Sequence, residues 1–196
     1  MSAPQELSIK EFQTLSDKVR RISIKNISKW DARFILRAAS ISLWSKDPST
    51  QVGCVLVRPD KTVASEGYNG LAPQIEDTEE RLNDRAIKYA FIDHAEENAL
   101  DYCRDPYPRT GYTAYVYPIH SCSKCFAKLL KQGVTRIVTT SIVHSRVSVN
   151  LPHIFKIIEE ANKNGIDIRI DFLDADAVDK SLVKLSASLL KLSKDD

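Results

Sequence analysis

The sequence predicts an α/β protein with three layers, helices on both faces of a five-stranded mixed sheet. Three observations predict this class. Short apolar runs such as QVGCVLVRP, rich in valine, are typical of buried strands. The first two strand-like runs are separated by a short turn, which indicates an antiparallel hairpin. After this hairpin, strand and helix patterns alternate, and such alternation favours crossover connections within a mixed sheet.

The first predicted helix covers residues 29–44. Its apolar residues, including Trp30, Phe34, Ala38 and Trp44, recur at helical spacing and form a stripe that should face the core. The other predicted elements are strands at 51–59, 62–70, 113–119, 135–141 and 167–173 and helices at 94–104, 122–133 and 151–165. The polar segment 71–92 is long enough to be a lid or a binding insertion.

The chain length of 196 residues suits one domain with a sizeable core. Residues 1–26 are polar and are interpreted as an N-terminal arm, followed by the main domain at 27–175. Residues 176–196 are predicted to contain an amphipathic helix. Its apolar members are Val178, Leu182, Leu185, Leu189 and Leu190.

The composition excludes several classes of protein. A net charge of +2 is too small to indicate a polyanionic partner by itself. We find neither an apolar run long enough to span a bilayer nor the basic and apolar blocks of a signal peptide, so a cytoplasmic protein is expected. Four cysteines are too few for a disulfide scaffold, which favours free thiols or metal binding.

Two short motifs carry the chemistry. His94 stands two places before Glu96, and Cys122 and Cys125 are three apart; each motif is predicted to open a helix. Zinc favours imidazole and thiolate ligands, and three protein ligands leave the fourth position open for water, as in catalytic sites. Zinc lowers the pKa of such a water to roughly 7, and Glu96 is placed to accept and deliver its proton. Ser121 is the expected N-cap of the second helix.

Simpler interpretations remain open for these residues. An HxE triplet alone is common on solvated helix faces, and a CxxC motif alone also fits redox chemistry or burial. A redox interpretation of the two cysteines leaves His94 and Glu96 without a role. Among the other candidate residues, His120 could line the pocket or replace a ligand. The remaining ones are expected to be structural: Cys54 and Cys103 in the core, and Glu97, His144 and His153 as surface or satisfied polar residues.

These motifs resemble those of the zinc-dependent cytidine deaminase-fold superfamily, and most closely its deoxycytidylate (dCMP) deaminase branch. The matching segments are WSKDPSTQVGCVLV (44–57), EGYNG (66–70), HAEENAL (94–100) and SCSKC (121–125). The pattern H-x-E with P-C-x-x-C is the known signature of zinc deaminases. One departure is clear: the family usually has proline before the first cysteine, whereas this chain has Ser121 there, in a loop that is one residue longer.

The resemblance implies a cytidine deaminase-like fold and hydrolytic deamination of dCMP to dUMP and ammonia, with Glu96 as the proton shuttle. It implies one zinc ion held by His94, Cys122 and Cys125. It suggests two groups of substrate contacts. Asn69 and Val52 would contact the sugar and base, and Ser45, Lys46 and Ser49, with Arg109 as a further candidate, would face a 5′-phosphate. Asn69 fits a turn position equally well, because Asn–Gly is a common turn pair, and Lys46 fits a solvated surface charge equally well.

Members of this branch are often homo-oligomers, dimers or hexamers, controlled by dCTP and dTTP, with Mg²⁺ on the phosphates of the effector. Tyr68 and Asn69 resemble positions near that effector site. Alternative substrates are dCTP, deoxycytidine, C5-modified dCMP or a polynucleotide. Against the last, the charge balance is near neutral and the segment IEDTEE is acidic, so a nucleic-acid partner is not expected. A zinc-binding relative without activity is the non-enzymatic alternative.

Overall fold

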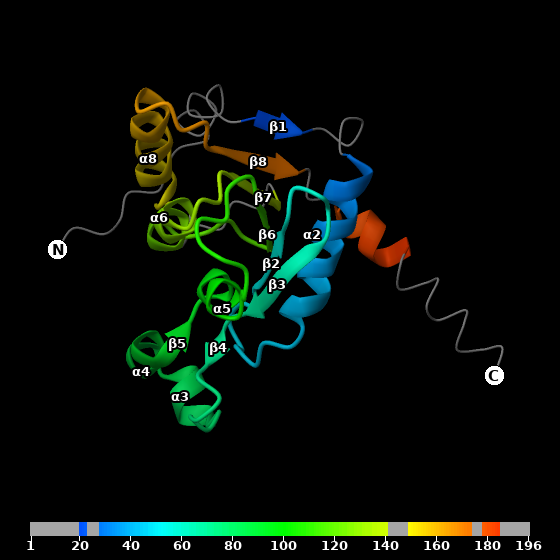
Figure 1. The fold of residues 1–196 in the computed structure, drawn as a ribbon. Helices are drawn as coiled ribbons and strands as arrows, with labels where there is room; N and C mark the ends of the chain where they lie inside the picture. Colours follow the sequence, from blue (N-terminus) through cyan, green and yellow to red (C-terminus); the bar gives the residue numbers. More distant parts are fainter. Residues whose placement is uncertain (1–19, 23–27, 141–148, 174–177, 185–196) are drawn as a thin grey trace.

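The computed structural model describes residues 20–22, 28–140, 149–173 and 178–184. Its centre is a six-stranded sheet in the order β1-β8-β7-β6-β2-β3 (Figure 1). The strands are β1 (Arg20–Ile22), β2 (Gly53–Val57), β3 (Val63–Tyr68), β6 (Thr113–Tyr117), β7 (Arg136–Thr140) and β8 (Arg169–Leu173). β2 is antiparallel to β3 and β6, whereas the pairs β6–β7, β7–β8 and β8–β1 are parallel.

The predicted α/β class and mixed sheet are confirmed, and all five predicted strands are present. The sheet is one strand wider than expected because β1 pairs with β8 at its edge. This strand lies within the segment that was predicted to be an N-terminal arm.

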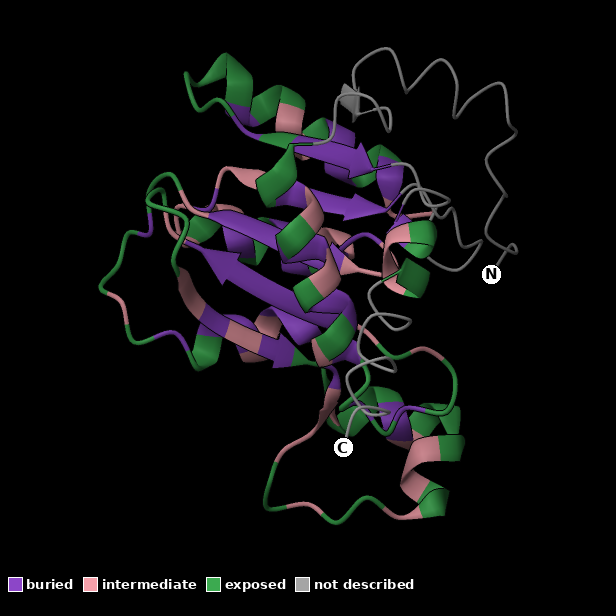
Figure 2. Ribbon diagram, turned by 90° about the vertical axis from the view of Figure 1, so that its right-hand side faces the viewer, coloured by how far each residue is buried: buried purple, intermediate pink, exposed green. Residues whose placement is uncertain are grey.

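Helices cover both faces of the sheet (Figure 1). They are α2 (Lys29–Ser42), α5 (Ala95–Asp101), α6 (Ser123–Lys131) and α8 (Leu151–Lys163). Strand residues alternate between two apolar clusters: Cys54 and Leu56 join the cluster under α5, α6 and α8, and Val55 and Val57 join the one under α2. This alternation is the period of two expected for a strand buried on both faces. Figure 2 accordingly shows the central strands mostly buried and the outer faces of the helices exposed.

The stripe predicted for α2 is correct at its centre and wrong at its ends. Phe34 and Ala38 are buried, but Trp30 is 42% exposed and Trp44 67% exposed. The helix ends at Ser42, so Trp44 no longer follows the helical spacing. At the other end, Trp30 stacks on Phe34 at 5.9 Å, outside the core.

Two glycines allow helices to approach the hairpin strands closely. A Cβ atom at Gly53 would lie 2.1 Å from the carbonyl oxygen of Ala38 on α2. One at Gly67 on β3 would lie 2.4 Å from the backbone nitrogen of Ala99 and 2.6 Å from the carbonyl oxygen of Ala95. Glycine at position 67 therefore lets α5 lie directly against the sheet.

The segment between β3 and α5 forms a small unit of its own, below the main sheet in Figure 1. Its elements are β4 (Gly70–Leu71), α3 (Glu79–Asn83), α4 (Arg85–Phe91) and β5 (Ile92–Asp93). β4 and β5 pair as a separate two-stranded sheet. Asp84 is the N-cap residue of α4, and its carboxylate accepts hydrogen bonds from the backbone N–H groups of Ala86 and Ile87.

Near the C-terminus, residues 178–184 are helical, and Val178 and Leu182 pack against the apolar cluster under α2. Leu185, Leu189 and Leu190 lie outside the described residues. The division of the chain at residues 26 and 175 stays a prediction. Among the helices of the described residues, none is both long enough and apolar enough to cross a membrane.

Candidate active site

The first turns of α5 and α6 bring three potential metal ligands together. His94 is the N-cap residue of α5, and Cys122 is the N-cap residue of α6. The Nδ1 atom of His94 lies 3.3 Å from Sγ of Cys125 and 3.6 Å from Sγ of Cys122. All three ligand atoms lie within 4.8 Å of one another.

This geometry fits a zinc ion. Zn–S bonds of about 2.3 Å and Zn–N bonds of about 2.0 Å in a tetrahedron separate the ligand atoms by about 3.5–3.8 Å. The two measured N···S distances, 3.3 and 3.6 Å, are close to that range. The donor set of one imidazole and two thiols is also the kind that zinc prefers. The described residues therefore fit zinc with three protein ligands and one open position.

The same three groups influence each other's protonation. Hydrogen bonds from Cys125 and His94 lower the pKa of Cys122 to about 4, despite the opposing effect of burial. The hydrogen bond to Cys122 raises the pKa of His94 to about 9, and it also raises the pKa of Cys125. These hydrogen bonds favour the thiolate form of Cys122, which is the form that binds zinc. Zinc binding requires the protons of the other two groups to leave.

The predicted N-cap of α6 is wrong by one residue. Cys122 occupies that position, and its Sγ accepts the backbone N–H of Cys125 at 3.4 Å. A thiolate can accept this bond as a serine hydroxyl would, so the cap and the metal ligand are the same residue. Ser121 is buried just before it and lies near Glu96.

His120 lies in the pocket wall and outside the group of metal ligands. It is 2% exposed, and its Nδ1 lies 2.9 Å from the carbonyl oxygen of Ser121. Since a carbonyl oxygen only accepts, Nδ1 carries the proton in this contact. Burial lowers the pKa of His120, which favours the neutral ring. Of the two roles left open, pocket lining is the one that the geometry supports.

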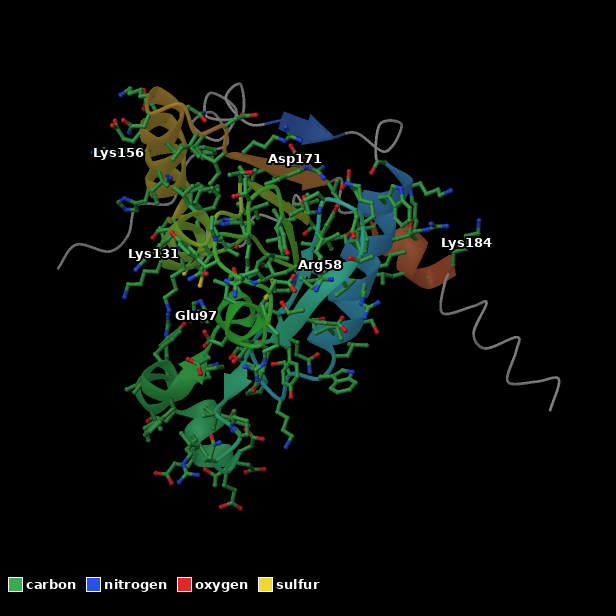
Figure 3. All side chains as sticks on the ribbon, viewed as in Figure 1. Arg58, Glu97, Lys131, Lys156, Asp171 and Lys184 are labelled. Carbon is green, nitrogen blue, oxygen red and sulfur yellow. The ribbon has the colours of Figure 1, made fainter. Side chains whose placement is uncertain are left out.

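Glu96 is buried in the first turn of α5 and lines the same pocket as His94 and Cys122. Burial raises the pKa of its carboxyl group, and Ser121 and His94 partly offset this rise. A raised pKa suits a carboxylate that must both take up and release a proton near neutral pH. The neighbouring Glu97, labelled in Figure 3, instead pairs with Lys128 of α6 and accepts the backbone N–H of His94 at 3.1 Å.

The pocket has a volume of about 260 Å³. This volume lies just below the roughly 300–1,000 Å³ typical of small-molecule sites, so the pocket suits one small ligand. Its lining residues are Asp47, Ser49, Thr50, Val52, Asn69, Lys88, Tyr89, Ile92, His94, Ala95, Glu96, Ile119, His120, Cys122 and Asn150.

Three of the predicted substrate-binding residues, Val52, Asn69 and Ser49, line this pocket. Asn69 also holds the pocket wall together. Its Oδ1 accepts the N–H of Val52 at 2.7 Å, and its Nδ2 donates to Asp47 and to the carbonyl oxygen of Thr50. Direct contact of these residues with a substrate stays a prediction.

The structure does not bring the other predicted contacts to the pocket. Ser45 is buried, with its hydroxyl oxygen 3.2 Å from the backbone nitrogen of Asp47, and Lys46 pairs with Asp77 at 2.8 Å on the surface. Arg109 is held by Gln132 and the carbonyl oxygen of Cys103. Tyr68, a candidate for the effector site, is 38% exposed.

The structure adds pocket residues that the sequence analysis missed, above all Lys88 and Tyr89 of α4. The available signal was the length of the 71–92 segment, which predicted a binding insertion but not which of its residues face inward. The interpretation of Cys54 and Cys103 as core residues is confirmed, and His153 is exposed as expected. His144 lies outside the described residues.

The α/β fold and the histidine–cysteine–cysteine group beside a buried glutamate define a zinc-type hydrolytic deaminase. The family model for the cytidine and deoxycytidylate deaminase zinc-binding region matches residues 28–141. The chain belongs to this family.

Similar proteins include an "Uncharacterized deaminase in luxG 3'region" of Aliivibrio fischeri, 36% identical over 111 residues, which are 57% of this chain and 72% of that protein. A "Probable deoxycytidylate deaminase" of Caenorhabditis elegans is 32% identical over 127 residues, or 62% of each chain. The "Deoxycytidylate deaminase" of Saccharomyces cerevisiae is 30% identical over 137 residues, and the match spans 65% of this chain but 43% of the yeast protein.

Among solved structures, the fold is similar to the dCMP deaminase of the cyanophage S-TIM5. The apo form gives a TM-score of 0.54 at 14% identity and covers 74% of this chain and 98% of the phage chain. The phage enzyme in complex with dCMP and dUMP gives a TM-score of 0.52 at 16% identity, over 71% of this chain and 94% of that one. At these identities the likeness concerns the fold.

Proposed function

We propose that this protein hydrolyses the bond between C4 of the cytosine ring and its amino group in deoxycytidylate, so that dCMP and water give dUMP and ammonia. The observation that carries this proposal is the position of Glu96. Its carboxyl group is buried in the first turn of α5 and lines one pocket together with His94 and Cys122. A proton shuttle and an open metal site thus face the same small ligand.

In the proposed reaction, His94, Cys122 and Cys125 would hold zinc, which when bound would activate a water molecule. Glu96 takes a proton from that water and delivers it to N3 of the cytosine ring, which makes C4 electrophilic. After the water oxygen has attacked C4, Glu96 takes the remaining proton from that oxygen and passes it to the amino group, so the C4–N bond breaks, ammonia leaves and C4 becomes a carbonyl carbon. The raised pKa of Glu96 supports this double role, since the group has to be reprotonated within each turnover.

Three observations support dCMP as the substrate. The segments SKDPSTQVG and GYNG resemble those of dCMP deaminases. Several similar proteins are named deoxycytidylate deaminases. The pocket of about 260 Å³ suits a mononucleotide better than a strand of nucleic acid. We also propose regulation by dCTP and dTTP, with Mg²⁺ on their phosphates, near Tyr68 and Asn69, in a homo-oligomeric enzyme.

The test is an assay of the purified, zinc-loaded protein with dCMP, dCTP, deoxycytidine and single-stranded DNA containing cytosine. We expect ammonia release to be fastest with dCMP. If another of these compounds is deaminated fastest, dCMP is not the preferred substrate, but the proposed deaminase activity stands. Absence of ammonia release with every substrate, from protein that contains zinc, would refute deamination of all four. Adding dCTP or dTTP with Mg²⁺ to the dCMP assay tests regulation.

A further inference from the structure

Glu97 connects the two helices at whose beginnings the proposed metal ligands lie. The two oxygens of its carboxylate have different partners. Oε2 accepts the backbone N–H of His94 at 3.1 Å, and Oε1 pairs with the ammonium group of Lys128 on α6. Among the described residues, this is the one ion pair between α5 and α6. Glu97 is therefore bonded to both halves of the metal site.

The bond to His94 restrains the backbone of a proposed ligand. His94 lies just before the first residue of α5, and its backbone is extended, with φ −77° and ψ 155°. Its carbonyl oxygen accepts the N–H of Asn98 at 3.0 Å, and its own N–H is donated to Glu97. The conformations open to a side chain depend on its backbone angles. These two bonds therefore restrict where the imidazole ring can lie.

The pair with Lys128 extends this restraint to α6. Lys128 follows Cys125 by three residues, so the two side chains lie on the same face of the helix, one turn apart. Elsewhere the two helices meet in an apolar cluster, through side chains such as Ala95 and Phe126. Apolar contacts have no preferred direction. The ion pair adds a directional link between the helices, one turn away from a proposed ligand.

The position of this pair matters more than its contribution to folding. The side chain of Lys128 is 56% exposed and that of Glu97 is 23% exposed, and ion pairs at the surface contribute little to stability. Metal binding has a stricter requirement, because ligands that are held in place beforehand need not be ordered when the ion binds. Residues that orient metal ligands from outside typically change metal affinity by about 10- to 100-fold when they are replaced.

We propose that Glu97 and Lys128 form a clamp that holds His94 and the two cysteines at the spacing that zinc requires, and so increases the affinity for the metal. Glu97 is a positioning residue, because it acts through His94 and is not among the residues that line the pocket. The inference rests on the zinc site of the proposed function and is independent of which substrate is deaminated.

The experiment measures the zinc dissociation constant of the whole chain and its variants by competition with a coloured chelator. Lys128→Met removes the cation, and Glu97→Gln removes the charge but keeps an oxygen for the N–H of His94. We expect each to bind zinc about 3- to 10-fold more weakly, less than for residues in direct contact with a ligand side chain. The double variant should be no worse than Glu97→Gln, because both changes remove the same interaction. Lys128→Arg should restore most of the affinity.

Lys131→Met is the matched control, since Lys131 is an exposed lysine of α6 that forms no ion pair with any described residue (Figure 3). Denaturant unfolding of the metal-free proteins separates a clamp from general support of the fold. We expect nearly equal stability for all variants. Co²⁺ in place of zinc adds an absorption spectrum that depends on the ligand geometry and needs no turnover. The bands of Lys128→Met and Glu97→Gln should shift, whereas those of Lys131→Met should not.

Three results would overturn the clamp. Lys128→Met could bind zinc as tightly as Lys131→Met does, the losses of the two single variants could add in the double variant, or the metal-free variants could lose as much stability as zinc affinity. Zinc affinity that depends on this pair, in a protein that releases no ammonia from any cytosine compound, would support the clamp and refute the proposed function alone.

Discussion

At the scale of single residues, single substitutions can test which side chains bind the metal. We expect about one zinc ion per chain in protein purified without added metal. Cys122→Ala removes both a ligand and the cap of α6, so it should lose zinc. His120→Ala should keep zinc, since its ring lies outside the ligand group. Elemental analysis after dialysis against a mild chelator measures both. If His120→Ala empties the site while Cys122→Ala does not, the proposed coordination is wrong.

Glu96→Gln keeps the shape of the side chain but cannot shuttle protons. Deamination should fall by roughly 10²–10⁴-fold or more while zinc is retained. Turnover of dCMP and zinc content, measured on the same sample, check this expectation. Asp101→Asn is the matched control, because Asp101 is an exposed carboxylate at the other end of α5. Near-normal turnover by Glu96→Gln would assign the proton transfer to another group.

The residues of the metal site could be predicted because their types and spacing define the chemistry without knowledge of the fold. Lys88 could not, since nothing in the segment RAIKYAF distinguishes an inward lysine from a solvated one. Its burial depends on Asp47, which lies far away in the sequence. For Lys46 the sequence was misleading. It lies in the segment 44–57 that resembles dCMP deaminases and was predicted to face a phosphate, but its side chain pairs with Asp77 on the surface.

At the scale of elements, the position of α5 depends on Gly67. Gly67→Ala would place a methyl group 2.4 Å from the backbone nitrogen of Ala99, and backbone cannot move aside as a side chain can. We expect the free energy of unfolding to fall by roughly 1–3 kcal/mol. We also expect weaker zinc binding, because His94 is the N-cap residue of α5 and a shift of this helix would move it. Denaturant unfolding and zinc titration measure the two effects.

Gly70→Ala is the control for this variant. It lies in the same segment, and the nearest atoms to its added methyl group are on the Tyr68 ring at 3.6 Å, an ordinary contact distance. Its stability should stay near that of the wild type. A Gly67→Ala protein as stable as the Gly70→Ala protein would contradict the close packing of α5 on β3.

Periodicity and turn signals predicted the existence of the main elements but not all their ends. The helix over 29–44 was expected to run through Trp44, whereas α2 stops at Ser42. The cap of α6 was assigned to Ser121 because serine is a common N-cap, and the thiol of Cys122 takes that place instead. For α6, cysteine is not among the usual N-cap residues, so local preference points to Ser121 instead of Cys122.

At the scale of the whole molecule, a buried ionic cluster joins α2 to the sheet. Asp31 accepts hydrogen bonds from Arg136 at 2.8 Å and from the hydroxyl of Tyr115 at 2.7 Å. Burial alone would raise the pKa of Asp31, but the hydrogen bonds from Arg136, Tyr115 and Ser28 lower it below 3.8. A carboxyl group with a depressed pKa stabilises the fold above its ordinary pKa, and this stabilisation is lost as the pH falls through the folded pKa.

Asp31→Asn should therefore cost about 2–4 kcal/mol of unfolding free energy near neutral pH, because Arg136 loses one of its two buried partners. The difference from the wild type should shrink as the pH falls below about 4. Unfolding measured at several pH values checks both statements. A difference that stays constant down to strongly acidic pH would exclude the ionised carboxylate as the source of the stability.

The overall architecture followed from the alternation of strands and helices after the hairpin, which predicted the layers and the mixed sheet. The sixth strand was missed, because β1 is three residues long and lies in a polar segment without strand periodicity. Its strand conformation comes from pairing with β8, a contact between distant parts of the chain. Local sequence carries no information about such a partner.

The small unit formed by β4, α3, α4 and β5 has a consequence for evolution. The proposed metal ligands and Glu96 lie at the beginnings of α5 and α6, which pack on the main sheet, whereas Lys88 and Tyr89 belong to α4 of the small unit. Substitutions within residues 70–93 can thus change the lining of the pocket without disturbing the helices that carry the proposed metal ligands. Selection can then act on substrate range and on reaction chemistry nearly independently. Homologues can therefore diverge in substrate range while they retain the same reaction chemistry.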